Sequence, residues 1–344
     1  MINVKISLPN EDSYSSFENF IDPRNKLLKN IRFHINNDVS EADFWFVFED
    51  LYKQQEKCLV DRKRVVYLNT ETSYPNSYFL NEHIKKYINQ FNLQYGCYET
   101  FVDNHFSAPP FLPWMIDYKS NTSIFSQNGK SVEDLMDLKS LKKTKSMSVI
   151  CSNKQQTENH KMRYEFTKKL KDYFGDELDW YGNGVIPVED KWEGIKDYKY
   201  HIVIENGQKN NLISEKLLDS YLGLSFPIYY GAPNISDYFP NKSLVKIDLN
   251  NFKETVKIIE NVINNNTYEN NIENIYSARN LVLGKHNFLN RISKIIETIG
   301  YEKEESSREM VVLNNVQSFW NDNTSLKRNC LLYTSDAADE EDSV

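Results

Sequence analysis

Charged and polar side chains gather at two points of the segment from Tyr198 to Pro240. Glu205-Asn206 follows a short apolar run, and Ser214-Glu215-Lys216 precedes a second apolar stretch. Free backbone N–H groups at the start of a helix attract anions, and a lysine there adds a positive charge. We therefore expect this segment to hold a phosphate-bearing ligand.

The elements around these residues form a strand-helix-strand unit. The apolar run from His201 to Ile204 predicts a buried parallel strand, and Phe226 to Tyr230 predicts a second one. Between them, Ser214 is a suitable N-cap for a helix that ends at Gly223. This helix would bury Leu217, Leu218, Tyr221 and Leu222. A parallel crossover of this kind places its polar groups at the carboxyl ends of the strands.

The same segment resembles the donor-binding signature of glycosyltransferase family 10, the α1,3-fucosyltransferases. That signature is an E-N pair, a variable loop, [ST]-E-K, a helix, a proline, a strand and a glycine. The matching residues are Glu205-Asn206, Ser214-Glu215-Lys216, Pro227, Gly231, Asn234 and Phe239-Pro240. The alternative is an ordinary β-α-β unit with a solvated Glu–Lys pair.

The resemblance implies an α/β protein of the GT-B fold, with two Rossmann-like domains facing each other across a cleft. It also implies metal-independent, inverting transfer of fucose from GDP-fucose to a hydroxyl of a GlcNAc-containing glycan. Leu212 departs from the family pattern, which usually has tyrosine there. Two alternatives therefore stay open: a GT-B transferase that uses another nucleotide sugar, and a non-catalytic glycan-binding or scaffold relative.

The resemblance implies that Arg163 and Lys216 hold the diphosphate of the donor from opposite walls of the cleft. Arg163 could instead lie on a solvated helix face, Asn206 could only shape a turn, and His201 could be structural. The donor-binding residues predicted in this way are Ser152, Asn153, Arg163, Tyr181, Gly182, His201, Glu205, Asn206, Ser214, Glu215 and Lys216.

Catalysis of the transfer requires a base for the acceptor hydroxyl, and the family supplies it from the N-terminal domain after a strand. Glu71 occupies that position in this chain, directly after the apolar run from Val65 to Leu68. A carboxylate at the carboxyl end of a strand can take a proton from an incoming hydroxyl. Glu71 is therefore the predicted catalytic base.

Length and periodicity agree with two α/β domains in series. The 344 residues are 40% hydrophobic and suffice for two cores. We expect an acceptor domain over residues 1–140, a donor domain over 146–300 and a partly disordered extension over 301–344. Further predicted strands are Val4–Leu8, Asp43–Phe48, Tyr95–Thr100 and Met147–Cys151, and the predicted helices are Asn81–Phe91, Asn159–Phe174 and Lys285–Ile299. The second helix would bury Met162, Phe166, Leu170 and Tyr173.

Composition argues against several other classes of protein. The net charge of −8 and the scattered basic residues do not indicate nucleic-acid binding. The four cysteines, which are Cys58, Cys97, Cys151 and Cys330, lack the spacing of a metal site or a disulfide framework. No stretch reads as a signal peptide or a membrane span, so we expect a cytoplasmic protein, with peripheral membrane association left open. The acidic tail from Tyr333 to Val344 is either disordered or an assembly scar.

Overall fold

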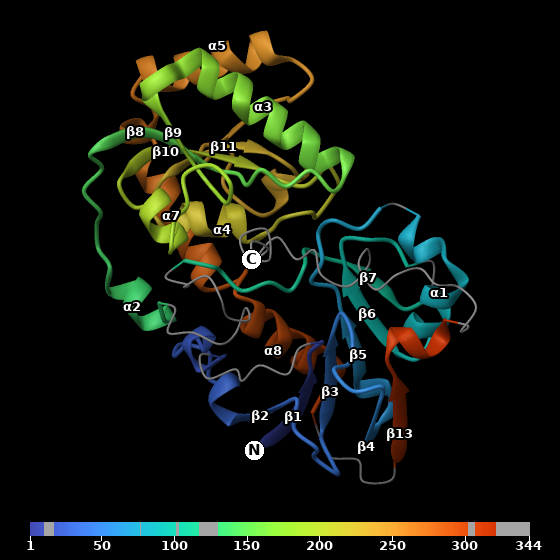
Figure 1. Cartoon of the computed structure of the whole chain (residues 1–344). Helices are drawn as coiled ribbons and strands as arrows, with labels where there is room; N and C mark the ends of the chain where they lie inside the picture. Colours follow the sequence, from blue (N-terminus) through green and yellow to red (C-terminus); the bar gives the residue numbers. More distant parts are fainter. Residues whose placement is uncertain (10–16, 76, 101–102, 117–129, 302–306, 321–344) are drawn as a thin grey trace.

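The computed structural model describes residues 1–9, 17–75, 77–100, 103–116, 130–301 and 307–320. The N-terminal part contains a six-stranded parallel sheet in the order β2-β1-β3-β5-β6-β7 (Figure 1). Its strands are β1 (Ile2–Ser7), β2 (Ile31–Ile35), β3 (Phe44–Phe48), β5 (Val65–Leu68), β6 (Leu93–Gly96) and β7 (His105–Ser107). Helix α1 (Glu82–Ile88) connects β5 to β6.

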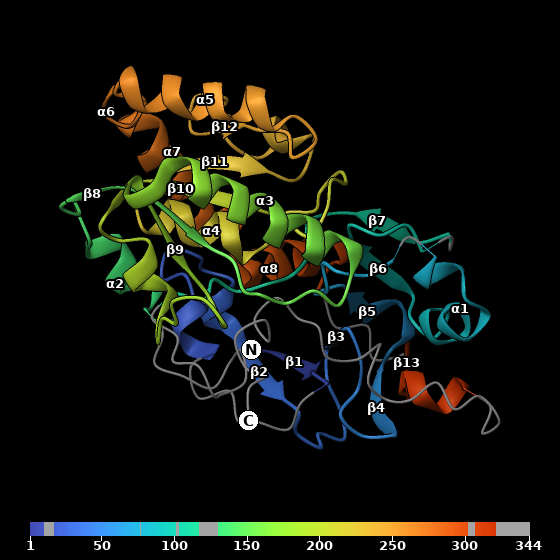
Figure 2. The same cartoon turned by 45° about the horizontal axis from the view of Figure 1, so that its top comes forward.

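The C-terminal part contains a five-stranded parallel sheet in the order β12-β11-β10-β8-β9. Its strands are β8 (Lys145–Ile150), β9 (Leu178–Tyr181), β10 (Tyr198–Ile204), β11 (Phe226–Tyr230) and β12 (Val245–Lys246). The helices of this part and of the segment leading to it are α2 (Val132–Asp137), α3 (Glu158–Phe174), α4 (Glu215–Leu222), α5 (Phe252–Asn264), α6 (Thr267–Asn270) and α7 (Ile272–Leu283). Helices α3 and α5 lie together on one side of the sheet in both views (Figures 1 and 2).

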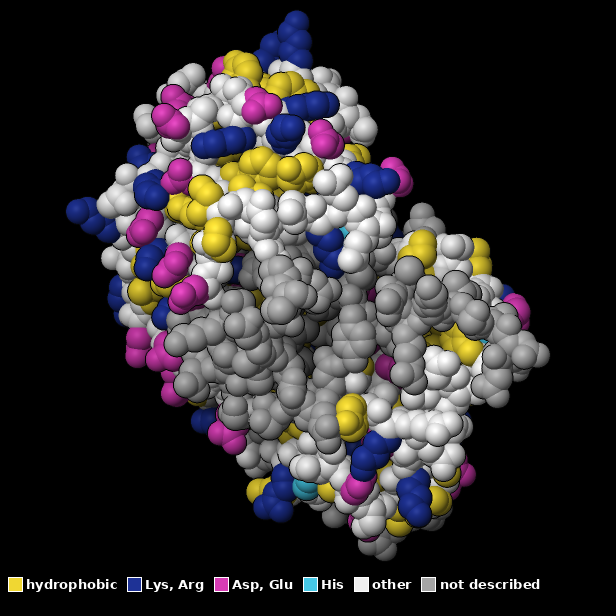
Figure 3. Space-filling view, in the orientation of Figure 1, with side chains coloured by type: hydrophobic (Ala, Val, Ile, Leu, Met, Phe, Trp, Pro, Cys, Tyr) yellow, Lys and Arg dark blue, Asp and Glu magenta, His cyan; other side chains and the backbone are white. Residues whose placement is uncertain are grey.

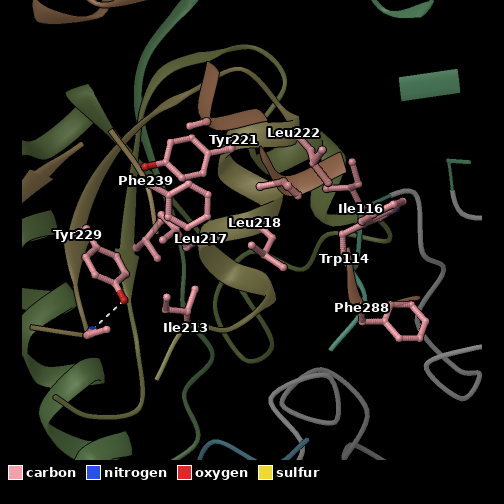
Figure 4. Close-up of a cluster of buried hydrophobic side chains, with 14 of the residues drawn as sticks. Trp114, Ile116, Ile213, Leu217, Leu218, Tyr221, Leu222, Tyr229, Phe239 and Phe288 are labelled. Atoms are coloured by element: carbon pink, nitrogen blue, oxygen red, sulfur yellow. Dashed lines mark hydrogen bonds between the residues drawn. The ribbon is translucent and has the colours of Figure 1, made fainter. Parts of the chain in front are cut away.

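The central strands are mostly apolar because both faces of each sheet are covered by other parts of the chain. All five residues of β3 and all five of β11 are buried. Helix α4 begins at its N-cap Ser214 and ends at Gly223, as the sequence predicts. Figure 4 shows its apolar side chains packed among residues of neighbouring segments. The labelled α4 residues there are Leu217, Leu218, Tyr221 and Leu222.

Two details of the prediction for these elements are wrong. Strand β6 ends at Gly96, and residues 97–100 are not a strand. At Gly96 the backbone passes so close to Asn69 that a Cβ atom would lie 2.5 Å from the Asn69 Cβ. Two of the residues that α3 is expected to bury are not buried: Met162 is half-buried, and Tyr173 is 54% exposed with its hydroxyl donating a hydrogen bond to Glu260. The buried face of α3 also includes His160, Arg163 and Thr167. Because these residues are polar, the pattern of apolar residues does not predict this face.

The end of the described chain returns to the N-terminal sheet. Helix α8 (Phe288–Ile299) lies beside that sheet, and its Phe288 ring contacts the rings of Phe17, Phe20 and Phe48 (Figure 1). Strand β13 (Arg308–Asn314) pairs antiparallel with β4 (Gln55–Asp61). The domain limits 1–140 and 146–300 stay predictions. We propose that α8 and β13 belong to the N-terminal domain, in place of an extension that begins at residue 301.

The face shown in Figure 3 carries acidic and basic side chains side by side over the described residues of the upper lobe. No helix in the described ranges has the length and apolar character needed to span a bilayer. Cys330, the tail from Tyr333 to Val344 and part of the segment between the two sheets lie outside the described residues.

We expect Phe288→Ala to destabilise the protein by about 3–5 kcal/mol, because the substitution leaves a cavity among three aromatic rings. Urea-induced unfolding, followed by circular dichroism, measures this free energy. Tyr301→Ala is the matched control, since Tyr301 is 48% exposed and its loss should change stability by less than about 0.5 kcal/mol. Equal stabilities for the two variants would contradict the placement of α8.

Candidate active site

Loops at the carboxyl edges of both sheets carry the candidate site residues. Glu71 follows β5 of the N-terminal sheet. Ser152 follows β8, and Glu205-Asn206 follows β10 of the C-terminal sheet. Parallel α/β sheets present ligand-binding groups at this edge, because the loops there can vary without disturbing the core.

A pocket in the C-terminal part collects three basic side chains. Arg163 comes from α3, Lys191 from the 3₁₀ turn Lys191–Gly194, and Lys216 from the first turn of α4. The remaining lining residues are Ile150, Ser152, Ile195, His201, Ile202, Val203, Ile204 and Asp219. Arg163 is only 3% exposed, so the alternative of a solvated helix face is wrong. Buried cations beside a helix N-terminus suit a ligand with several negative charges.

The amide of Asn206 connects this pocket to the N-terminal domain. Its Oδ1 accepts a hydrogen bond from Nη1 of Arg163, and its Nδ2 donates to Oγ of Ser73 over 2.7 Å. The role of Asn206 is therefore more than shaping a turn. Ser73 lies two residues after Glu71, so the predicted base and the basic pocket are joined through three side chains.

Backbone hydrogen bonds fix the Glu71 carboxylate. Its Oε1 accepts from the N–H groups of Thr72 and Ser73, over 2.7 and 2.6 Å. The loop itself is held by Glu49, whose Oε2 accepts from the backbone N–H groups of Thr70 and Glu71. Tyr67 and Tyr74 each donate a hydroxyl hydrogen bond of 2.7 Å to the other carboxylate oxygen of Glu49. A carboxylate with this many donors is a rigid support for the loop.

Both acidic residues of the family signature make internal contacts. Glu205 accepts hydrogen bonds from the backbone N–H and the hydroxyl of Ser214, over 2.8 and 2.6 Å. Burial raises the pKa of Glu205 to about 7, although nearby Lys216 and the Ser214 hydrogen bonds oppose the shift. Glu215 lies 3.2 Å from Nζ of Lys216 and 3.5 Å from Nζ of Lys191. Glu215 therefore positions both lysines.

His201 is buried at the pocket and is neutral. Burial lowers the pKa of its imidazole to about 3, and the charges of Lys143 and Lys191 lower it further. The Ser148 hydroxyl donates to the carbonyl of Gly194, so Nδ1 of His201 must donate to Ser148 Oγ over 2.8 Å. This tautomer leaves Nε2 as an acceptor on a residue that lines the pocket.

Seven of the eleven predicted donor residues lie outside the lining of the pocket, and three of these, Asn153, Tyr181 and Gly182, belong to the loops beside it. The Asn153 N–H donates to the carbonyl of Asn183, and the Tyr181 hydroxyl forms a hydrogen bond with that of Tyr198. Gly182 has a φ of 140°, and a Cβ atom there would lie 2.5 Å from the carbonyl oxygen of Cys151. Glycine at this position lets the 181–184 turn press against the loop that carries Ser152.

Leu212, which departs from the family pattern, points away from the basic pocket. It is buried in the hydrophobic cluster of the N-terminal domain that includes Phe79, Cys97 and Tyr98. The neighbouring Lys209 places its ammonium group 4.5 Å from the centre of the Tyr98 ring. Leu212 therefore contributes to the contact between the domains.

Four contributing residues are absent from the sequence prediction. Ser73 and Glu49 act through contacts that no local pattern reveals. Lys191 lies in a segment where the sequence offers only a turn. Only for Asp219 among these four does the sequence contain a pattern that could have predicted its place. It lies four residues after Glu215 and therefore on the same face of α4.

The two parallel sheets, with polar groups at their carboxyl edges, agree with the two Rossmann-like units that the sequence predicts. Comparison with known proteins shows what the C-terminal part of the chain is similar to. Residues 140–275 match the model of the C-terminal part of glycosyltransferase family 10 (fucosyltransferase). A stretch of 74 residues is 35% identical to the alpha-(1,3)-fucosyltransferase FucT of Helicobacter pylori, and it covers 21% of this chain and 16% of that protein.

Solved structures also resemble this chain. A crystal structure of an alpha1,3-fucosyltransferase aligns over 80% of each chain with a TM-score of 0.49 and 20% identity. Another, of an alpha1,3-fucosyltransferase with GDP-fucose, aligns over 79% of this chain and 81% of the other, with a TM-score of 0.47 and 19% identity. The similarity to the C-terminal part of glycosyltransferase family 10 lies in residues 140–275.

The raised pKa of Glu205 predicts a pH-dependent stability. Between the ordinary value of 4.5 and about pH 7 the folded state keeps a proton that the unfolded state has lost. Stability therefore falls as pH rises through this window, by about 3 kcal/mol from this group. We expect Glu205→Gln to remove that loss. Urea unfolding of both proteins at pH 4.5 and 7.5 measures the difference.

The control for this measurement is Glu158→Gln, since the Glu158 side chain is 90% exposed. It should follow the wild-type stability at both pH values. Parallel stability curves for wild type and the Glu205 variant would show that the buried carboxyl does not titrate in this window.

Proposed function

We propose that this protein transfers fucose from GDP-fucose to a hydroxyl group of a GlcNAc-containing glycan, with inversion at the anomeric carbon. The family match of residues 140–275 supports a fucosyltransferase-type donor domain. The observation that carries the proposal is the three-residue connection from the buried Arg163, through Asn206 and Ser73, to the loop of Glu71. It brings a basic pocket and a carboxylate together across two domains.

The proposed reaction is a single displacement. The acceptor hydroxyl gives its proton to the Glu71 carboxylate while its oxygen forms a bond to the anomeric carbon of the donor. The bond from that carbon to the phosphate oxygen breaks, and its electron pair leaves with GDP. Arg163, Lys191 and Lys216 face the negative charge that develops on the diphosphate, and fixed cations in a buried pocket stabilise such charge strongly.

The alternative donor, another nucleotide sugar, rests on the replacement of the family tyrosine by Leu212. Leu212 is buried against the N-terminal domain and does not line the basic pocket. A thermal-shift screen with GDP-, UDP- and dTDP-sugars separates the two donors, because only a ligand that binds the folded state raises the melting temperature. The proposal expects the largest shift with GDP-fucose.

We expect Lys216→Ala to weaken GDP binding by about 10- to 100-fold, because one charged hydrogen bond to a phosphate contributes about 1.5–3 kcal/mol. Isothermal titration calorimetry measures this affinity. Lys169→Ala removes an exposed lysine from α3 and is the control, with an expected change below about twofold. Equal affinities for GDP in the two variants would remove Lys216 from the donor site.

We expect Glu71→Gln to lower the rate of fucose transfer by about 10²- to 10⁴-fold, which is the usual contribution of a general base. The affinity for GDP should change by less than about threefold, since Glu71 lies in the acceptor domain. The assay follows transfer from GDP-fucose to an N-acetyllactosamine-type acceptor.

A non-catalytic scaffold predicts a different result from the same assay. The Glu71 variant and the wild type would then be indistinguishable. Wild-type protein that neither hydrolyses GDP-fucose nor transfers its sugar would contradict the proposed function itself.

A further inference from the structure

Asp219 has a buried carboxyl group, and one of its two oxygens forms no hydrogen bond with the described residues. The residue is 1% exposed and lines the basic pocket from the second turn of α4. Its Oδ1 accepts a hydrogen bond of 2.8 Å from the backbone N–H of Met115. Its Oδ2 is buried and has no hydrogen-bond partner among the described residues. A buried polar atom without a partner costs about 1–3 kcal/mol, so its retention in a pocket indicates a ligand contact.

A second polar atom in the same pocket shows the same pattern. Oγ of Ser152 is buried and also lacks a hydrogen-bond partner in the described part of the chain. Ser152 follows β8, whereas Asp219 lies on α4, so the two atoms come from separate elements that line the same pocket. The pocket therefore combines two polar atoms without hydrogen bonds to the described residues and three cationic side chains. This combination suits an anion with several oxygen atoms.

The charges around Asp219 decide its protonation. Burial raises the pKa of its carboxyl to about 8, Glu215 and Asp190 raise it as well, and Lys191 lowers it. Arg163, Lys216 and neutral His201 also line the pocket. At neutral pH Asp219 is therefore a carboxylic acid. Because Oδ1 accepts from Met115, the acid proton belongs on Oδ2.

We propose that Asp219 is a binding residue of the donor pocket, which donates a hydrogen bond from Oδ2 to an anionic oxygen of the nucleoside diphosphate. This inference rests on the proposed function and adds to it a fourth group, besides the three cations, that holds the leaving diphosphate. A neutral acid suits this position, because an ionised carboxylate would repel the phosphate oxygens.

The proposal makes donor binding weaken at alkaline pH. Binding requires the protonated acid, so affinity falls as pH rises above the pKa of the carboxyl. Between pH 7 and 9 the protonated fraction drops from about nine-tenths to about one-tenth, so the affinity should fall by roughly tenfold. In Asp219→Asn the amide Nδ2 replaces the acid as a donor that does not titrate, and the side-chain oxygen can still accept from Met115.

The test is isothermal titration calorimetry of the full chain with GDP, and separately with inorganic pyrophosphate, at pH 7 and 9. We expect wild type to lose about tenfold in affinity for both ligands over this interval, and Asp219→Asn to lose less than about twofold. Asp219→Ala should bind GDP at least tenfold more weakly than wild type at pH 7. Asp172→Asn, at an exposed position of α3, should keep the wild-type pH dependence.

Three other outcomes would overturn one or both proposals. Parallel pH profiles for wild type and Asp219→Asn, with GDP bound by both, overturn the role of Asp219 and leave the proposed function standing. A loss of more than tenfold in Asp219→Asn at pH 7 also overturns it, because the group would then act as an ionised acceptor. Failure of wild type to bind either ligand overturns both proposals. Circular dichroism confirms that each variant is folded.

Discussion

The candidate site depends on two hydrogen bonds of the Asn206 side-chain amide, one with Arg163 and one with Ser73. This amide is buried, and it must satisfy Arg163 on one side and Ser73 on the other. An amide flipped or removed would take one buried hydrogen bond from the Arg163 guanidinium, which is costly. The Asn206 side chain therefore links the basic pocket to the Glu71 loop, and the contacts of Leu212 and Asn211 with the N-terminal part add to this link.

The negative charges near the site already have partners within the protein. Glu215 lies between two lysines, Glu205 accepts from Ser214, and Glu49 accepts from tyrosine hydroxyls and backbone N–H groups. With Asp219 neutral, the lining retains an excess of positive charge. In the proposed reaction, an anionic ligand would thus meet a pocket whose charge is arranged before binding, and the departing diphosphate would require little reorganisation.

The parts of the fold that local patterns control could be predicted from the sequence. Ser214 caps α4 because a hydroxyl before an apolar run satisfies free N–H groups, and strands β5 and β11 have the predicted bounds. The position of Glu71 after β5 could also be predicted from the sequence, because the apolar run before it is a strand. Glu49 could not be found in this way, because its role comes from contacts with residues about 20 positions away. Strand β13 was missed for the same reason, since its partner β4 lies far back in the chain.

The return of the chain to the N-terminal sheet sets an order for biosynthesis. Phe17, Phe20 and Phe48 leave the ribosome early, but Phe288, the ring that they pack against, is made only after every strand of the C-terminal sheet. The C-terminal sheet is therefore complete before the N-terminal core can close. During translation the aromatic side chains of the N-terminal part stay exposed until Phe288 is made. Chaperones that bind exposed apolar segments are therefore expected to bind the nascent chain.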